Sequence, residues 1–182
     1  MPAADLNYVK NQITSTLISM MEKNDFRSIT VSALAKKAGV GRASFYRHYR
    51  DTSDVIRQYL DRLTSQWRDV YDQTPETDQM RLMLTHFYRN KRFYLALYRA
   101  GLSGMLREEI QDAFQQSQQT DNCTAYLIGW FTGATFGWID EWIRRGMQET
   151  PEQMLDFLAN FLLQKAAEKT KTSLADTAEA KR

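Results

Sequence analysis

The sequence predicts an all-α protein in which an N-terminal three-helix domain is joined by a bridging helix to a C-terminal helical domain. Apolar residues recur at three- and four-residue steps along most of the 182-residue chain, which is the spacing of amphipathic helices. The triplet Thr-Pro-Glu, typical of a helix start, occurs at both 74–76 and 150–152. We therefore expect domains at residues 1–50 and 74–167, a bridging helix at 51–73 and a disordered tail at 168–182.

The first predicted helix spans Asp5 to Lys23 and is followed by Asn24 and Asp25, which end it. Its apolar positions follow a helical period on one face: Leu6, Val9, Ile13, Leu17, Met20 and Met21.

The next stretch, Ile29 to Tyr49, reads as two short helices around a tight turn. Thr30 is suited to the N-cap of the first helix, because its hydroxyl can accept from an unpaired backbone N–H. Gly39 is suited to a left-handed cap at the end of that helix. Ala35 is small enough for two helices to cross closely. The second helix begins at Gly41 or Arg42 and runs to His48, so the stretch has the pattern of a helix-turn-helix.

The bridging helix starts after Asp51, which we expect to cap it, and continues to about Tyr71 with one apolar face. Beyond it the sequence predicts helices at 76–89, at 91–100 with an extension past Gly101 through 106–118, at 123–147, and from Pro151 to about Ala167. Thr74 and Thr150 are expected to cap the helices that follow them, the latter in a capping box with Gln153.

Positive charge is concentrated on the helix-turn-helix. The whole chain has a net charge of +2, but residues 24–50 contain six Lys and Arg against one acidic residue. A basic face can be merely solvated, yet on such a motif it is the surface that DNA requires.

The helix-turn-helix resembles the N-terminal domain of TetR/AcrR-type transcriptional repressors from about Asn7 to Leu63. The resemblance rests on Thr30, Ala35, Ala38, Gly39, Val40, Ser44, Phe45, Tyr46, Tyr49 and Asp51. The family usually carries a phosphate-binding lysine where this chain has Thr52, whose hydroxyl can still bond a phosphate without contributing charge.

In such a motif the second helix enters the major groove of double-stranded DNA. We expect Arg42 to read a guanine, Ala43 to touch a thymine methyl, and Ser44, Tyr46, Arg47 and His48 to make phosphate or mixed contacts. Backbone clamps are expected from Thr30, Ser32, Tyr49, Arg50 and Thr52. For Tyr46 and Tyr49 a packing role is the alternative.

In the resembling family the C-terminal domain binds a small-molecule inducer, which alters the spacing of two DNA-reading heads. Aromatic side chains at helical spacing could line such a pocket or form plain core. The residues expected there are Trp67, Tyr71, His86, Phe87, Phe93, Tyr94, Tyr98, Tyr126 and Trp130.

A homodimer is expected for a protein that reads a two-fold operator. Gly129, Gly133 and Gly137 form a bare stripe that lets another backbone approach, either in the same chain or in a partner subunit. The family implies a four-helix bundle built from the last two helices, and the expected interface comprises those glycines with Trp138, Trp142, Leu155, Leu158 and Leu162. The segment 129–154 also resembles, more loosely, regulators of dihydroxyacetone kinase operons.

Other classes of protein fit less well. The two histidines and one cysteine form no metal-ligand or catalytic spacing, and no phosphate loop is present, so neither an enzyme nor a cofactor is expected. Residues 122–139 carry no charge, but their threonines, glycines and charged continuation favour a buried helix over a membrane span. The absence of a signal peptide and the lone Cys123 suit the cytoplasm. The alternative function is an interaction protein, such as a coactivator, that acts through its C-terminal domain.

Overall fold

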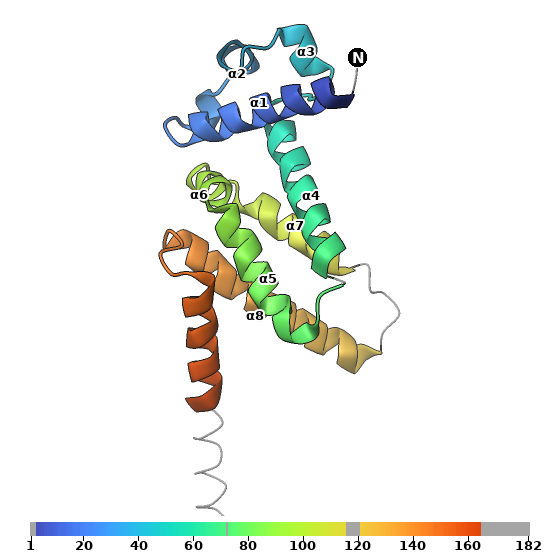
Figure 1. The fold of residues 1–182 in the computed structure, drawn as a ribbon, viewed down its shortest axis with the longest axis vertical. Helices are drawn as coiled ribbons and strands as arrows, with labels where there is room; N and C mark the ends of the chain where they lie inside the picture. The colour runs from blue at the N-terminus through green and yellow to red at the C-terminus, as the bar shows by residue number, and fades with distance from the viewer. Residues whose placement is uncertain (1–2, 72, 116–120, 165–182) are drawn as a thin grey trace, which may run out of the picture.

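The computed structural model describes residues 3–71, 73–115 and 121–164, and all regular structure in these ranges is helical. At one end lies a head made of α1 (Ala3–Met21), the short 3-10 helix η1 (Phe26–Ser28), α2 (Val31–Lys37) and α3 (Arg42–Tyr46). Figure 1 shows α2 and α3 at the tip of the molecule, above α1. Ile13 and Leu17 of α1, Leu34 and Ala35 of α2, and Phe45 of α3 are buried together in the core of this head.

The turn between α2 and α3 follows from its residues. Thr30 Oγ1 accepts from the Ala33 backbone N–H at 3.2 Å and caps α2. At the other end, Gly39 has a φ of +67°, and the Val40 N–H donates back to the Ala35 carbonyl at 3.0 Å. A left-handed residue with this backward hydrogen bond is the usual glycine-ended helix terminus. The predicted caps at Thr30 and Gly39 are thus confirmed.

A long helix, α4 (Thr52–Tyr71), runs from the head into the C-terminal helices (Figure 1). Its start is fixed by two carboxylates: Asp51 Oδ1 accepts from the Asp54 N–H at 2.8 Å, and Asp54 Oδ2 accepts from the Arg50 N–H at 2.9 Å. One face of α4 is buried from Val55 to Leu63, and the helix packs against α1, α7 and α5.

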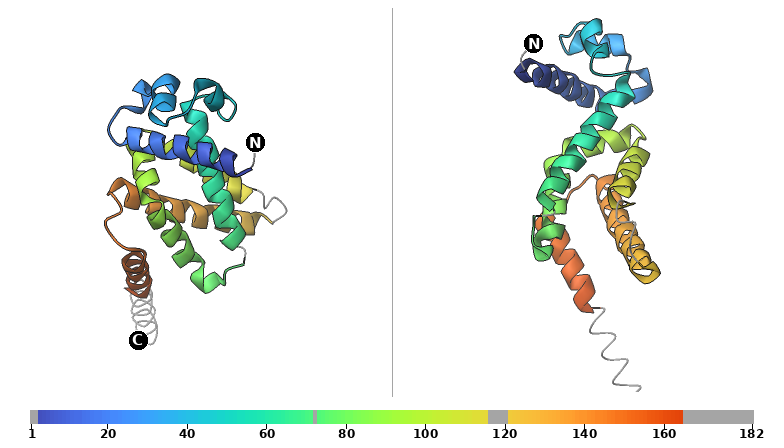
Figure 2. Two further views of the ribbon diagram at one scale, coloured as in Figure 1. Left: turned by 45° about the horizontal axis from the view of Figure 1, so that its top comes forward. Right: turned by 90° about the vertical axis from the view of Figure 1, so that its right-hand side faces the viewer.

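The body consists of α5 (Glu76–Arg89), α6 (Lys91–Arg99), α7 (Ser103–Gln115), α8 (Asn122–Arg144) and a helical segment at 151–164. The views in Figure 2 show the last segment descending beside the other helices, away from the head. Leu84, Leu97, Leu106 and Ile139 are fully buried between these helices. Of the helices in the described ranges, none combines the length and the apolar character that a membrane span requires.

An ion pair joins the head to the body. Arg92 on α6 makes two hydrogen bonds with the Glu22 carboxylate just after α1, at 2.6 and 2.9 Å, and Arg99 donates to the Glu22 carbonyl at 2.7 Å. The end of α1 is therefore held by α6, the same helix that also packs on α8.

Beyond shifts of one or two residues, as at both ends of α1 and at the end of α3, three helix boundaries differ from the sequence prediction. The helix expected to continue past Gly101 stops at Arg99, because Gly101 takes a φ of +70° and Leu102 N–H returns to the Leu97 carbonyl; α7 is a separate helix. Likewise α8 ends at Arg144, before positive φ values at Gly146 and Met147.

The third difference is at Thr74. It does not cap α5, because its hydroxyl donates to the Val70 carbonyl and closes the end of α4. The capping box of Thr150 and Gln153 is present as predicted. The expected helix ends at 116–118 and 165–167 and the tail at 168–182 lie outside the described residues.

Candidate DNA interface and regulatory cavity

The outer face of α3 carries side chains that can reach a nucleic acid. Phe45 points into the head, which turns Arg42, Ala43, Tyr46 and Arg47 outward. The Tyr46 side chain is 52% exposed and is held by an edge contact with Phe45, at 5.6 Å between ring centroids. An exposed but anchored aromatic hydroxyl of this kind suits a contact to DNA.

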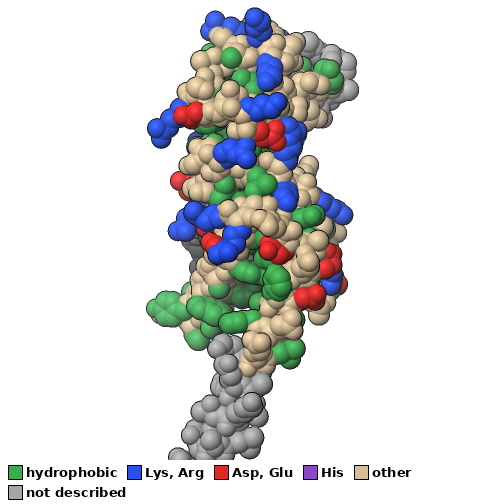
Figure 3. All heavy atoms as spheres, turned by 90° about the vertical axis from the view of Figure 1, so that its left-hand side faces the viewer, with side chains coloured by type: hydrophobic (Ala, Val, Ile, Leu, Met, Phe, Trp, Pro, Cys, Tyr) green, Lys and Arg blue, Asp and Glu red, His purple; other side chains and the backbone are tan. Residues whose placement is uncertain are grey.

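Other predicted clamp residues surround α3. Thr30, Ser32 and Arg50 are exposed, while Ser44 and Thr52 are half-buried with Thr52 opening α4. Within the described residues, none of Lys36, Lys37, Arg42, Arg47 and Arg50 forms an ion pair, so their charges are available to a polyanion. Figure 3 shows Lys and Arg side chains on the head end of the molecule.

One predicted contact is corrected. Tyr49 is only 4% exposed, packs at 5.7 Å on the Phe45 ring and lies under the Lys10 ammonium, so it belongs to the core of the head. Burial raises the pKa of its phenol. His48 is half-buried, and burial together with Lys10 and Arg47 lowers its pKa. A neutral imidazole can still donate a hydrogen bond to a phosphate, so the contact expected at His48 stays a prediction.

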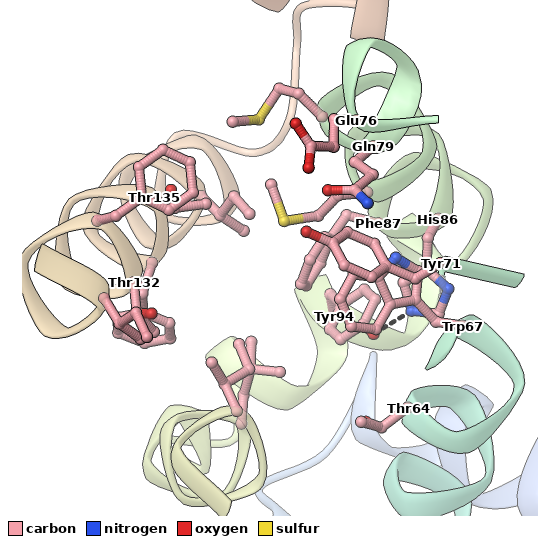
Figure 4. Close-up of a pocket in the computed structure, with 18 of the residues that line it drawn as sticks. Thr64, Trp67, Tyr71, Glu76, Gln79, His86, Phe87, Tyr94, Thr132 and Thr135 are labelled. Carbon is pink, nitrogen blue, oxygen red and sulfur yellow. Dashed lines mark hydrogen bonds between the residues drawn. The ribbon is translucent and has the colours of Figure 1, made fainter. Parts of the chain in front are cut away.

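A cavity of about 550 Å³ lies in the body between α4, α5, α6, α7 and α8. Five of the predicted pocket residues line it together: Trp67, Tyr71, His86, Phe87 and Tyr94. Figure 4 shows them as one wall, facing the α8 wall that carries Thr132 and Thr135. The Trp67 and Tyr71 rings are 4.5 Å apart, and the Phe87 and Tyr94 rings are 4.6 Å apart.

One polar pair, of a half-buried histidine and a buried tyrosine, lies in this wall. The His86 Nε2 and the Tyr94 hydroxyl lie 2.9 Å apart. Burial lowers the pKa of His86 to about 4 and raises that of Tyr94, so both side chains are uncharged at neutral pH. The pair satisfies its polar atoms without placing a charge in the cavity.

Four residues predicted for the pocket lie elsewhere. Phe93 packs edge-to-face on Tyr59 at 4.7 Å, and the Tyr98 hydroxyl donates to Asp140 at 2.7 Å. Tyr126 and Trp130 are 74% and 72% exposed, on the opposite side of α8 from the cavity. These residues were predicted to line the pocket because they are aromatic, but their positions on the helices direct their side chains away from the cavity.

Most of the α8 wall was missed by sequence reasoning although a signal was present. Ile128, Thr132, Thr135 and Ile139 recur at three- and four-residue steps and all line the cavity. The prediction for α8 concerned the opposite face instead, whose three glycines were assigned to a dimer interface. Sequence reasoning also missed Met80, Met83 and Ile110, which line the cavity as well.

The opposite stripe of α8 is bare in the chain. No atom lies within 4 Å of where a Cβ would stand on Gly129, Gly133 or Gly137, so within the described residues no other helix approaches them. The sequence predicted a buried helix for the charge-free residues 122–139. In the structure the first half of α8 is exposed on the side that carries these glycines, so that prediction is wrong there.

The helical segment 151–164 adds further exposed apolar side chains. Leu155 and Leu158 are half-buried and Leu162 is exposed. Phe157, Phe161 and Leu163 are also exposed, which the sequence reading did not single out. Figure 3 shows hydrophobic side chains gathered at the end away from the head.

One predicted interface residue is corrected. Trp142 is 2% exposed and stacks on Tyr88 with ring planes 8° apart, so it is core in this chain. Trp138 is half-buried against the same core. The last turns of α8 are covered by α6, whereas the first turns are not.

Two family models match the chain, one over the head and the other over the body. Residues 13–59 match the family model of bacterial regulatory proteins of the TetR family, and residues 76–164 match a transcriptional regulator C-terminal region. No curated protein matches the sequence significantly.

Solved structures with the same fold include Lin0861 from Listeria innocua, at 19% identity and a TM-score of 0.66, covering 93% of this chain and 94% of that one. The dihydroxyacetone kinase operon activator DhaS matches at 17% identity and a TM-score of 0.57, covering 86% and 95%. A TetR-family transcriptional regulator from Syntrophomonas wolfei matches at 13% identity and 0.64, covering 84% and 92%.

At such identities these structures show the fold alone. The family models supply the stronger evidence, because one matches most of the head with its helix-turn-helix and the other matches the body that carries the cavity. The chain belongs to the TetR family of bacterial transcriptional regulators.

Proposed function

We propose that this regulator is a homodimeric repressor that binds a palindromic operator through α3 and leaves it when a small molecule occupies the cavity. The observation that carries the DNA-binding part is the outer face of α3, where Arg42, Tyr46 and Arg47 stand exposed beside unpaired basic residues. Arginine bidentate to guanine is the commonest specific base contact, and Arg42 at the start of α3 is placed to make it.

Dimerisation is proposed through α8 and the segment 151–164. Each presents exposed apolar side chains, among them Tyr126 and Trp130 on the first and Leu162 on the second. Two such helices from each of two subunits form a four-helix bundle around a two-fold axis. That symmetry would place two α3 helices on successive major grooves of a palindrome.

Effector control is proposed to pass through α4 and α6. Trp67 and Tyr71 line the cavity from the far end of α4, whose first residue follows the helix-turn-helix. Tyr94 lines it from α6, which holds the head through Arg92 and Glu22. A ligand that spreads these helices would shift the head, because both connections are direct. In this proposal residues 1–50 are the DNA-binding domain, 51–73 the bridging helix, and 74–167 the regulatory and dimerisation domain.

The test is binding of the purified protein to the intergenic DNA upstream of its own gene. We expect Arg42→Ala to lose roughly 1–3 kcal/mol of specific binding. Arg145→Ala, which removes the same charge from an exposed site on the body, should leave binding unchanged. Affinity should fall steeply as salt rises. Equal binding by wild type and Arg42→Ala, only at low salt, would overturn the proposal and favour the coactivator alternative.

The sign of regulation needs its own measurement, since DhaS, one of the structural neighbours, is named an activator. A reporter fused to the bound promoter should be more active when the regulator is deleted. Lower activity after deletion would show an activator and refute the repressor assignment.

A further inference from the structure

The cavity contains almost no charge. Among the described residues that line it, Glu76 is the single acidic residue, and it is exposed at the start of α5. No lysine or arginine is among those lining residues.

This lining is unfavourable for an anion. A carboxylate, sulfonate or phosphate transferred from water into an apolar site is costly unless a cation or several donors compensate it. His86 is the one imidazole in the wall, and its bond to Tyr94 and its lowered pKa keep it neutral at physiological pH. An anionic amphiphile would thus be buried against aromatic and aliphatic surface without a counter-charge.

The cavity does offer one unused donor. The indole Nε1 of Trp67 is buried and has no hydrogen-bond partner among the described residues. A buried donor without a partner is rare and costs about 1–3 kcal/mol. Trp67 lies in the aromatic wall (Figure 4), but its Nε1 is covered in this structure, so an acceptor on a bound molecule reaches the N–H only when the indole turns toward the cavity as the molecule enters.

We infer that the cavity binds an uncharged, mainly apolar molecule with a hydrogen-bond acceptor that receives the Trp67 indole N–H, and that it rejects anionic amphiphiles. This inference rests on the proposed effector role of the cavity and names the class of effector. A ketone, ester, ether or aromatic nitrogen would supply the acceptor. The volume of about 550 Å³ suits a molecule of two or three fused or linked rings, or a chain of similar bulk.

The first test compares two fluorescent probes with one apolar frame. N-phenyl-1-naphthylamine is neutral, whereas 8-anilinonaphthalene-1-sulfonate carries one sulfonate. Only fluorescence that a neutral competitor displaces is counted, because the sulfonate probe also binds exposed apolar surface. We expect the neutral probe to bind at least about tenfold more tightly, as one uncompensated charge implies. Equal or tighter binding of the sulfonate would overturn the inference.

A charge introduced into the cavity separates this effect from the differing hydrophobicity of the probes. Gln79→Arg places a cation in the lining and should shift the ratio of the two dissociation constants toward the sulfonate by about tenfold. Gln148→Arg adds the same charge at an exposed position after α8 and should leave the ratio unchanged. The same shift in both variants would show a general surface effect and refute the argument.

The second test addresses the acceptor. Displacement of the neutral probe by 2-acetonaphthone and by 2-ethylnaphthalene compares molecules of nearly equal shape with and without a carbonyl. Trp67→Phe should weaken the ketone about fivefold and leave the hydrocarbon unchanged, as expected for one hydrogen bond. Trp142→Phe removes the other unpartnered buried indole, which lies outside the cavity, and serves as the control. An equal effect of Trp67→Phe on both competitors would refute the role of the indole.

These measurements use the full chain without DNA, so they do not depend on operator release. If the selectivity holds but the ketone fails to release the operator, the effector role proposed above fails while the ligand class stands. If release occurs with an anionic molecule instead, the class is wrong and the effector role stands.

Discussion

Replacing Gly133 with alanine is expected to raise the stability of the single subunit and to weaken the proposed dimer. Gly133 lies inside α8 with helical backbone, and no atom stands within 4 Å of the position that a Cβ would occupy. In the isolated chain the alanine therefore meets no obstacle. Alanine is better than glycine in a helix interior by about 1 kcal/mol, so the subunit itself should become more stable, with a melting temperature higher by about 2–4 °C.

The proposed dimer should respond in the other way. If Gly129, Gly133 and Gly137 let the partner's backbone approach, an added methyl group overfills that contact at a cost of about 1–3 kcal/mol. Two-fold symmetry imposes the cost twice. The dissociation constant of the dimer should thus rise by at least about tenfold.

Sedimentation equilibrium measures dimer affinity, and thermal unfolding at a protein concentration below the dimer dissociation constant measures subunit stability. Gly104→Ala is the matched control, because Gly104 is a helical glycine of α7 with equally open space around it. It should leave the dimer unchanged. Higher subunit stability with unchanged or tighter dimerisation in Gly133→Ala would refute the close approach at the glycine stripe.

Three further predictions follow from the head, the joint and the cavity. Tyr46→Ala should keep the melting temperature nearly unchanged and weaken operator binding by roughly 1–3 kcal/mol. Tyr49→Ala should lower the free energy of unfolding by about 3 kcal/mol or more in a denaturant titration. Equal free energies of unfolding for the two variants would contradict the exposure of Tyr46 and the burial of Tyr49. Arg92→Ala should cost under about 1 kcal/mol of stability, since the pair is exposed, but it should alter effector-induced release of DNA. Arg145→Ala, which breaks an equally short pair at the end of α8, should leave that release unchanged. The pKa of His86 is about 4 in the folded chain against 6.5 for a free imidazole. The unfolded chain therefore binds more protons between these values, and unfolding free energy should fall as pH drops through that window, by at most about 1.4 kcal/mol per pH unit. A pH series of urea titrations should show this slope reduced in His86→Gln, and an unchanged slope would contradict the assignment.

The helix-turn-helix was predictable from the sequence because its determinants are local. A cap at Thr30, a left-handed glycine at 39 and a small residue at 35 act within a few residues of one another, and the structure forms the turn they specify. The same holds for the start of α4 at Asp51 and for the capping box at Thr150. Local hydrogen bonds of this kind do not depend on how distant segments pack.

The candidate sites were predictable only in part. Tyr46 and Tyr49 are three residues apart on one short stretch, yet one is exposed and the other is covered by Phe45 and Lys10. The covering lysine comes from α1, which is distant in sequence. Residue type alone gives no rule that separates two such tyrosines.

The sequence by itself determined the helices, most of their ends, the basic helix-turn-helix and the apolar character of α8. Only the tertiary structure decided which face of α8 lines the cavity, which face stays bare, and that Trp142 is core while Trp130 is exposed. The physical reason is that α8 is apolar on both sides. A helix with one apolar face reveals its buried side through its period, but a helix with two requires its neighbours to decide which side is covered.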